Sequence, residues 1–199
     1  MLAKPDLKYE DLHDKRGNST GRVWHAQKAL VNLRVGGVAG PTEGSIEEPM
    51  TWLTKLKHKG LIRHLGVSNV TSEQLDEARK LTDIVCVQNF YNVANRNDDA
   101  FIDRLATEGI PYVPFFPLGG FTPLQSSLLD WVAVRLQATP MQVALAWLLQ
   151  RSPNMLLIPG TSSLNHLRQN LYAAGLELPS DVIAELNSIG KNAVVTRET

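Results

Sequence analysis

Polar side chains stand at the ends of two short apolar runs and could bind a polar ligand. Ser68 and Asn69 follow the run that begins at His64, and Gln88 ends the run that begins at Ile84. Taken singly, each has an ordinary structural explanation as a turn residue or as a buried, satisfied amide. Taken together, fixed hydroxyl and amide groups at successive strand ends favour a binding site.

A second cluster of hydroxyl groups lies further along the sequence. Thr161, Ser162 and Ser163 precede a helix that is predicted to begin near Leu164. Backbone N–H groups and hydroxyls at the start of a helix form a natural site for phosphate. The alternative is an ordinary serine-capped helix, which is common.

Five short apolar runs predict the β-strands that would position these groups. Amphipathic segments typical of helices separate them, and successive runs are about thirty residues apart, the length of one βα unit. Strands that are apolar nearly throughout indicate a parallel sheet with both faces covered. The predicted strands are Ala29–Val35, His64–Ser68, Ile84–Gln88, Tyr112–Phe116 and Asn154–Pro159.

Capping signals predict where several helices begin and end. Ser45 and Glu48 form a capping box ahead of a helix that Gly60 closes, and Thr139 with Pro140 starts a helix that runs to Gln150. The remaining helices are predicted over Thr71–Leu81, Asp98–Glu108, Leu124–Leu136, Leu164–Ala173 and Ser180–Ile189.

The order of these elements fits an incomplete (β/α)8 TIM-type barrel. A doubly wound open sheet is the alternative, but it usually carries a G-x-G-x-x-G turn after its first strand, which this sequence lacks. Residues 1–29 show no apolar alternation and are too few for the further βα units of a full barrel. We expect an irregular arm over residues 1–29 and one barrel domain over residues 30–199, with its N-terminal strands missing or rebuilt.

Four motifs in order resemble segments of the aldo-keto reductase family. Gly60–Asn69 (GLIRHLGVSN) is similar to the end of its fifth strand, and Val87–Asn92 (VQNFYN) to its sixth. Val113–Gly119 (VPFFPLG) is similar to its seventh strand, and Ile158–Asn170 (IPGTSSLNHLRQN) to its eighth strand and the helix that binds the adenosine 2′-phosphate. The resemblance covers about residues 30–190 and is closest to a bacterial subgroup that includes pyridoxal reductases.

The resemblance implies an oxidoreductase that reduces an aldehyde or ketone, a pyridoxal-like one among the candidates, with NADP(H) or alternatively NAD(H). It implies that amide and hydroxyl groups bind the nicotinamide carboxamide while an aromatic ring stacks on the nicotinamide. The implied cofactor-binding residues are Ser68, Asn69, Gln88, Phe115, Pro117, Leu118, Gly119, Gly160, Thr161, Ser162, His166, Arg168, Gln169 and Asn170.

Three of these positions depart from the family pattern. The family often has lysine where Gly160 stands and arginine where His166 stands, and Arg168 is the nearest replacement. Those changes weaken the expectation of a strong preference for NADP over NAD. Phe115 replaces the usual tyrosine, a change that leaves stacking possible because any aromatic ring supplies it.

The catalytic residues of the family cannot be placed on this sequence. The family uses a tyrosine as general acid with a lysine and an aspartate, because a phenol with a pKa of about 10 needs a nearby cation to donate near neutrality. The spacing of Asp6 and Tyr9 does not match, and Asp11 falls at the lysine position. The histidine that orients the carbonyl would fall near Arg34.

Three hypotheses about function therefore remain open. The first is an active reductase, for which Tyr91 and His64 would be the first alternative proton donors. The second is a truncated, catalytically inactive nucleotide-binding or interaction protein. The third is part of an ordinary reductase whose sequence is altered over residues 1–29.

Composition limits the partners of the chain. Twenty basic and twenty acidic residues cancel, which favours neither a nucleic-acid groove nor an anionic membrane surface. Cys86, the single cysteine, lies in an apolar run and is expected to be a buried structural thiol, with no metal site. Met1–Gly21 does not resemble a signal peptide, which favours a cytoplasmic location.

Ala29–Val35 and Asn154–Pro159 would be open sheet edges, so a homo-oligomer is expected.

Overall fold

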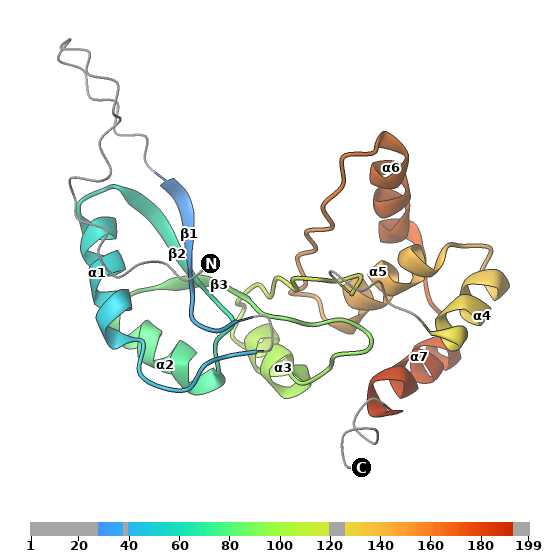
Figure 1. The fold of residues 1–199 in the computed structure, drawn as a ribbon, viewed down its shortest axis with the longest axis horizontal. Helices are drawn as coiled ribbons and strands as arrows, with labels where there is room; N and C mark the ends of the chain where they lie inside the picture. Colours follow the sequence, from blue (N-terminus) through green and yellow to red (C-terminus); the bar gives the residue numbers. More distant parts are fainter. Residues whose placement is uncertain (1–27, 38–39, 120–125, 193–199) are drawn as a thin grey trace, which may run out of the picture.

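Strands and helices alternate along the first half of the described chain, and helices dominate the second half. The computed structural model describes residues 28–37, 40–119 and 126–192. The elements in chain order are β1 (Lys28–Arg34), α1 (Glu47–His58), β2 (Ile62–Ser68), α2 (Ser72–Leu81), β3 (Ile84–Gln88), α3 (Asp99–Thr107), α4 (Ser127–Arg135), α5 (Pro140–Arg151), α6 (Leu164–Tyr172), the 3-10 turn η2 (Ala173–Gly175) and α7 (Ser180–Asn192). Figure 1 shows β1–β3 with α1 and α2 at one end of the molecule and α4–α7 at the other.

The sheet is parallel, as the sequence predicts. β1, β2 and β3 lie side by side in chain order. In the register of the sheet, Arg34 pairs with Ser68, and Ser68 pairs with Gln88. The last residues of the three strands therefore form a row along one edge of the sheet.

The fourth and fifth predicted runs follow the same parallel order but do not form strands. Tyr112 makes isolated parallel bridges with Val87 on one side and with Met155 on the other. Prolines explain the interruption, because Pro111, Pro114, Pro117, Pro153 and Pro159 have no N–H to donate to a ladder. The prediction of five strands is thus wrong for Tyr112–Phe116 and Asn154–Pro159, whereas their order and direction are confirmed.

The two faces of the sheet differ, because side chains alternate along a strand. Leu65, Val67 and Val87 are 0% exposed and belong to the hydrophobic core. The alternate positions carry polar groups that interact with one another across the strands, so the expectation of strands apolar on both faces is wrong here. These residues are Asn32, Arg34, Ser68, Cys86 and Gln88.

Local capping explains the starts of two helices. Thr71 and Thr139 each accept a hydrogen bond from the backbone three residues on, and each completes a capping box with a glutamine, at α2 and α5. The predicted box at Ser45 is wrong. Ile46 is the N-cap of α1, and the Glu77 carboxylate accepts both the Ser45 hydroxyl and the Ile46 N–H, the latter at 2.8 Å. A carboxylate from α2 has therefore replaced the predicted local partner.

The remaining predicted helices are present with small changes at their ends. α3 and α6 each begin within one residue of the predicted start, and α7 continues beyond the predicted end. Ser126 caps α4, and the predicted start of that helix at Leu124 lies outside the described residues.

Within the described ranges no single helix is long and apolar enough to cross a membrane, and α4 with α5 reaches that length only across a bend of 91°.

A stack of aromatic rings joins the sheet to the C-terminal helices. The Trp147 ring of α5 stacks on Tyr91 at a centroid distance of 5.9 Å, and Tyr91 meets Tyr112 edge to face. All three side chains are fully or almost fully buried. In contrast, α6 buries none of its residues. The core therefore runs from the sheet into α5 and stops short of α6.

Candidate functional site

The structure brings together the polar strand ends that the sequence predicts. Ser68 and Asn69 are each 1% exposed at the end of β2, and Gln88 is half-buried beside them at the end of β3. Arg34 completes the row at the end of β1. We call Arg34, Ser68, Asn69, Gln88 and Phe115 the strand-end cluster.

The Gln88 amide is oriented by Asn32, a neighbour that sequence reasoning did not place in the site. The Asn32 amide nitrogen donates to Gln88 Oε1 at 3.1 Å. Gly66 leaves the room for Asn32, because a Cβ there would lie 2.1 Å from Asn32 Oδ1 and 2.7 Å from Cys86 Sγ. Since its oxygen is already engaged, Gln88 presents its two amide N–H groups to a ligand.

The Asn69 amide is fixed the other way round from Gln88, with its N–H groups engaged and its oxygen available. Its φ of 58° lies in the left-handed region, which asparagine tolerates better than most residues. Its amide nitrogen donates to the carbonyl oxygens of Gly37 and Gly40, the latter at 2.7 Å. Both of its N–H groups are thereby used to hold the loop after β1, and Oδ1 is the group that can accept from a ligand.

Phe115 presents an aromatic surface next to these amides. It is 7% exposed, and its ring stacks on Phe90 with the centroids 5.7 Å apart. The guanidinium carbon of Arg34 lies over the same ring, 4.6 Å from its centroid. Arg34 Nη1 also donates to Ser68 Oγ at 3.4 Å.

The sequence carries a signal for Asn32 and Arg34. Both are polar residues at alternate positions of an otherwise apolar run, which places them on one face of a strand. Their partners Gln88 and Ser68 lie on other strands, so only the register of the sheet reveals the contacts.

A tight turn follows Phe115 and holds three of the predicted cofactor-binding residues, Pro117, Leu118 and Gly119. Phe116 has a φ of 54°, and the Gly119 N–H donates to its carbonyl oxygen at 3.0 Å. The Asn92 amide donates to the same oxygen at 3.1 Å. Pro117 is buried and Leu118 is partly buried, so the turn is anchored against the core.

The predicted phosphate end gathers at the start of α6, away from β1–β3 (Figure 1). Ser163 is the N-cap and accepts from the His166 N–H at 3.4 Å, while Thr161 Oγ1 accepts from the Ser163 N–H at 3.1 Å. The other predicted residues of this segment are exposed or only partly buried, and they are Gly160, Ser162, Arg168, Gln169 and Asn170. The start of α6 is therefore an ordinary capped helix end, and the surrounding protein encloses it little.

The buried tyrosines lie in the core rather than in the strand-end cluster. Tyr91 donates its hydroxyl to Asp99 at 2.5 Å, and Tyr112 donates to Asp98 at 2.8 Å. Burial, reinforced by the neighbouring carboxylates, raises the pKa of both phenols far above the ordinary value. Both hydroxyls are therefore engaged by aspartates within the core and not by the strand-end cluster. His64 is exposed on β2.

Asp98 and Cys86 are two further groups with displaced pKa values. Burial raises the pKa of the Asp98 carboxyl above its ordinary value of 3.8, although hydrogen bonds from Asn89 and Tyr112 oppose this. Burial also raises the pKa of the Cys86 thiol, and its sulfur lies 3.5 Å from Asn32 Oδ1. The expectation that this thiol is buried is confirmed. Among the described residues, no group of three or more metal-ligating side chains comes together.

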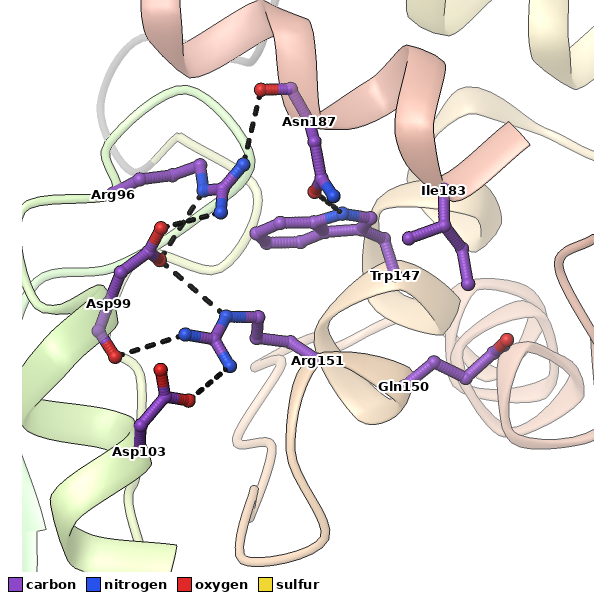
Figure 2. A pocket seen from close by; sticks show the side chains of 8 residues that line it. All are labelled: Arg96, Asp99, Asp103, Trp147, Gln150, Arg151, Ile183 and Asn187. Atoms are coloured by element: carbon purple, nitrogen blue, oxygen red, sulfur yellow. Dashed lines mark hydrogen bonds and ion pairs between the residues drawn. The ribbon is translucent and has the colours of Figure 1, made fainter. Parts of the chain in front are cut away.

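Figure 2 shows a cavity between α3, α5 and α7 whose walls are tied together by ion pairs and hydrogen bonds. Arg151 Nη1 lies 2.7 Å from Asp103, and the Trp147 indole N–H donates to Asn187 Oδ1 at 3.0 Å. Arg96 pairs with Asp99 and donates to the Asn187 carbonyl oxygen at 3.1 Å. The residues that line this cavity connect α3, α5 and α7, and the cavity is separate from the strand-end cluster.

Comparisons with known proteins identify the family of the chain. The aldo/keto reductase family model matches residues 8–191. Over 164 residues the chain is 62% identical to pyridoxine 4-dehydrogenase from Escherichia coli (strain K12), covering 81% of this chain and 57% of that protein. It is 40% identical over 147 residues to an uncharacterized oxidoreductase from Schizosaccharomyces pombe, covering 73% of this chain and 48% of that protein.

Solved structures share the fold. The crystal structure of the thermostable aldo-keto reductase Tm1743 matches with a TM-score of 0.70 at 30% identity, over 82% of this chain and 60% of that one. An aldo/keto reductase from Klebsiella pneumoniae, in complex with NADP and acetate, matches with a TM-score of 0.68 at 24% identity, over 82% and 59%. The chain thus spans about half to three fifths of the length of these relatives. It belongs to the aldo/keto reductase family.

Proposed function

We propose that the strand-end cluster binds the nicotinamide of NADP(H), and that the protein is an oxidoreductase acting on an aldehyde or ketone. The observation that carries this is the complementary orientation of two amides. Gln88 offers N–H donors and Asn69 offers an oxygen acceptor, while a nicotinamide carboxamide carries one C=O and one NH2 group. Ser68 Oγ can add a further hydrogen bond.

The remaining residues of the cluster fit the same ligand. The buried Phe115 ring supplies a flat apolar surface on which a nicotinamide can stack. The dinucleotide, when bound, supplies or receives the hydride. The residues of this chain hold the ring by its carboxamide and by its face, which fixes the side of the ring that meets the substrate.

The start of α6 is the proposed site of the adenosine phosphate. Free backbone N–H groups and the hydroxyls of Thr161 and Ser162 lie at this helix N-terminus, where the helix dipole favours an anion. His166 and Arg168 lie on the same helix and are exposed. We expect NADP(H) to be the cofactor, with NAD(H) accepted because these cations are not enclosed.

A pyridoxal-like carbonyl compound is the proposed substrate. The supporting observation is 62% identity to a protein named pyridoxine 4-dehydrogenase, of which this chain covers 57%. Because the match is partial, both the substrate and the turnover are proposals for this chain.

A second candidate is a protein that binds the dinucleotide without turning over a substrate. The environment of the buried tyrosines favours it, because Tyr91 and Tyr112 donate to aspartates within the core. Tyr172, on α6, is 69% exposed and belongs to an element that buries no residue. Of the described tyrosines, none therefore lies in the strand-end cluster.

Steady-state oxidation of NADPH with pyridoxal, and separately with a nitrobenzaldehyde, tests the enzymatic proposal. Dependence of the rate on the carbonyl compound would support a reductase. Binding of NADPH without any such dependence would support the second candidate. Absence of both binding and turnover would contradict the proposed function.

We also propose that the chain self-associates. Leu30 of β1 is 46% exposed, and Leu156 and Ile158 in the last predicted run are 56% and 46% exposed. Apolar side chains at both edges would be covered by a second copy. Light scattering at micromolar concentration tests this, and a monodisperse monomer would contradict it.

A further inference from the structure

Arg34 places a positive charge among the proposed contacts of the nicotinamide. Its Cα pairs with Ser68 in the sheet register, so its backbone is fixed at the end of β1. Its guanidinium carbon lies 4.6 Å from the centroid of the Phe115 ring. The same group donates to Ser68 Oγ at 3.4 Å and to the Gly37 carbonyl oxygen at 3.3 Å.

Within the described part of the chain, the charge of Arg34 is not neutralised by a carboxylate. Its hydrogen-bond acceptors are a hydroxyl and a carbonyl oxygen, both of them neutral. Among residues 28–37, 40–119 and 126–192, no carboxylate forms an ion pair with it, whereas Arg79, Arg96, Arg104, Arg135 and Arg151 all pair with acids. An arginine side chain stays charged at any pH at which proteins are folded.

A nicotinamide that stacks on Phe115 would take the place of the guanidinium over that ring. The guanidinium can move, because its side chain is exposed and its hydrogen bonds are long. Its backbone stays in β1, so the charge remains within one side-chain length of the nicotinamide. The cost of moving it is the same for the oxidised and the reduced dinucleotide, because both present the same ring shape.

We propose that Arg34 makes the site prefer the reduced dinucleotide over the oxidised one. The inference rests on the proposed function, since it assumes that the nicotinamide stacks on Phe115. The oxidised nicotinamide ring carries one positive charge and the reduced ring carries none, so only the oxidised form is repelled by Arg34. Two unit charges about 5 Å apart in a water-like dielectric change a binding constant by about fourfold.

The test is calorimetric titration of NADPH and NADP+ into the full chain and into three variants. Arg34→Gln removes the charge, Arg34→Lys keeps it, and Arg63→Gln removes an exposed arginine near the other end of β2 as a matched control. We expect Arg34→Gln to reduce the ratio of the Kd for NADP+ to that for NADPH by about fourfold. The lysine variant and the control should keep the wild-type ratio, and added salt should shrink the wild-type preference.

Each contrary outcome has a distinct meaning. If both forms bind to Arg34→Gln with the wild-type ratio, the inference about Arg34 is wrong while the proposed function stands. Equal weakening of NADPH and NADP+ binding in Arg34→Gln also overturns the inference, because the loss of a charge must change the two affinities by different factors. If the wild-type chain binds neither form, the proposed function and the inference both fail.

Discussion

The strand-end cluster and the start of α6 are the two ends of one proposed dinucleotide site, and they are built differently. In the strand-end cluster, each amide is fixed by a partner from another part of the chain, as Gln88 is by Asn32. At the start of α6, the Thr161 and Ser163 hydroxyls accept from the local backbone. Tertiary packing therefore orients the proposed nicotinamide end. Local helix capping shapes the start of α6 at the proposed phosphate end, while Gln142 of α5 donates to the Gln169 carbonyl oxygen further along α6 at 3.4 Å.

The difference extends to stability, and a pair of leucine truncations should expose it most strongly. Leu65 of β2 is 0% exposed, whereas Leu167 of α6 is 44% exposed. We expect Leu65→Ala to lower the free energy of unfolding by about 2–5 kcal/mol because it opens a cavity. Leu167→Ala should change it by less than about 0.5 kcal/mol. Urea denaturation of both variants measures this, and similar losses would show that α6 is packed as firmly as the sheet.

Gly66→Ala should disturb both the stability and the nicotinamide end. An added Cβ would meet Asn32 Oδ1 at 2.1 Å, so Asn32 must shift from Gln88 or the strands must separate. Overpacking of this kind costs about 1–3 kcal/mol. Gly175→Ala is the control, because a Cβ there meets nothing within 4 Å. Urea melts with NADPH titrations test this, and a variant that behaves like the control would refute the role given to Gly66.

Asp98 should make the stability of the core fall as the pH rises above about 4. Burial raises the pKa of this carboxyl above its ordinary value of 3.8, so in that window the folded chain keeps a proton that the unfolded chain has lost. Raising the pH through the window therefore lowers the free energy of unfolding. Asp98→Asn should remove this slope and leave a constant offset from its changed hydrogen bonds. Urea melts of both proteins between pH 4 and 7 measure it, and parallel curves would contradict the assignment.

Arg168→Gln should have the smallest effect, because α6 leaves this side chain exposed. A solvent-exposed charge pair contributes up to about 1 kcal/mol, so we expect NADPH to bind about twofold to threefold more weakly. NADH, which lacks the 2′-phosphate, should bind as before. A tenfold or greater loss for NADPH would mean that the phosphate end is as enclosed as the strand ends.

Features that depend on neighbouring residues in the sequence could be predicted from it. The caps at Thr71 and Thr139 and the ends of β3 are predicted correctly, because the residues that decide them are adjacent. The box at Ser45 fails because Glu77, on another helix, is the better partner.

The contacts that organise the site could not be predicted in the same way. Asn32 and Gln88 are far apart in the sequence, and only the sheet register brings them together. The resemblance to the family identifies Gln88, but it does not show whether the amide oxygen or the amide N–H groups are free to bind a ligand. The charge of Arg34 over Phe115 likewise appears only when β1 is placed in the sheet.

The central claim is that Gln88 presents its amide N–H groups to the carboxamide of a bound nicotinamide. Calorimetric titration of NADPH into the wild-type chain, Gln88→Ala and the control Gln150→Ala tests it most directly. Gln150 lies on α5 and donates to the Leu176 carbonyl oxygen, outside the strand-end cluster. We predict that Gln88→Ala weakens binding about fivefold, the effect of one hydrogen bond of about 1 kcal/mol, while the control binds like the wild type. Equal affinity for NADPH in all three proteins would contradict the account.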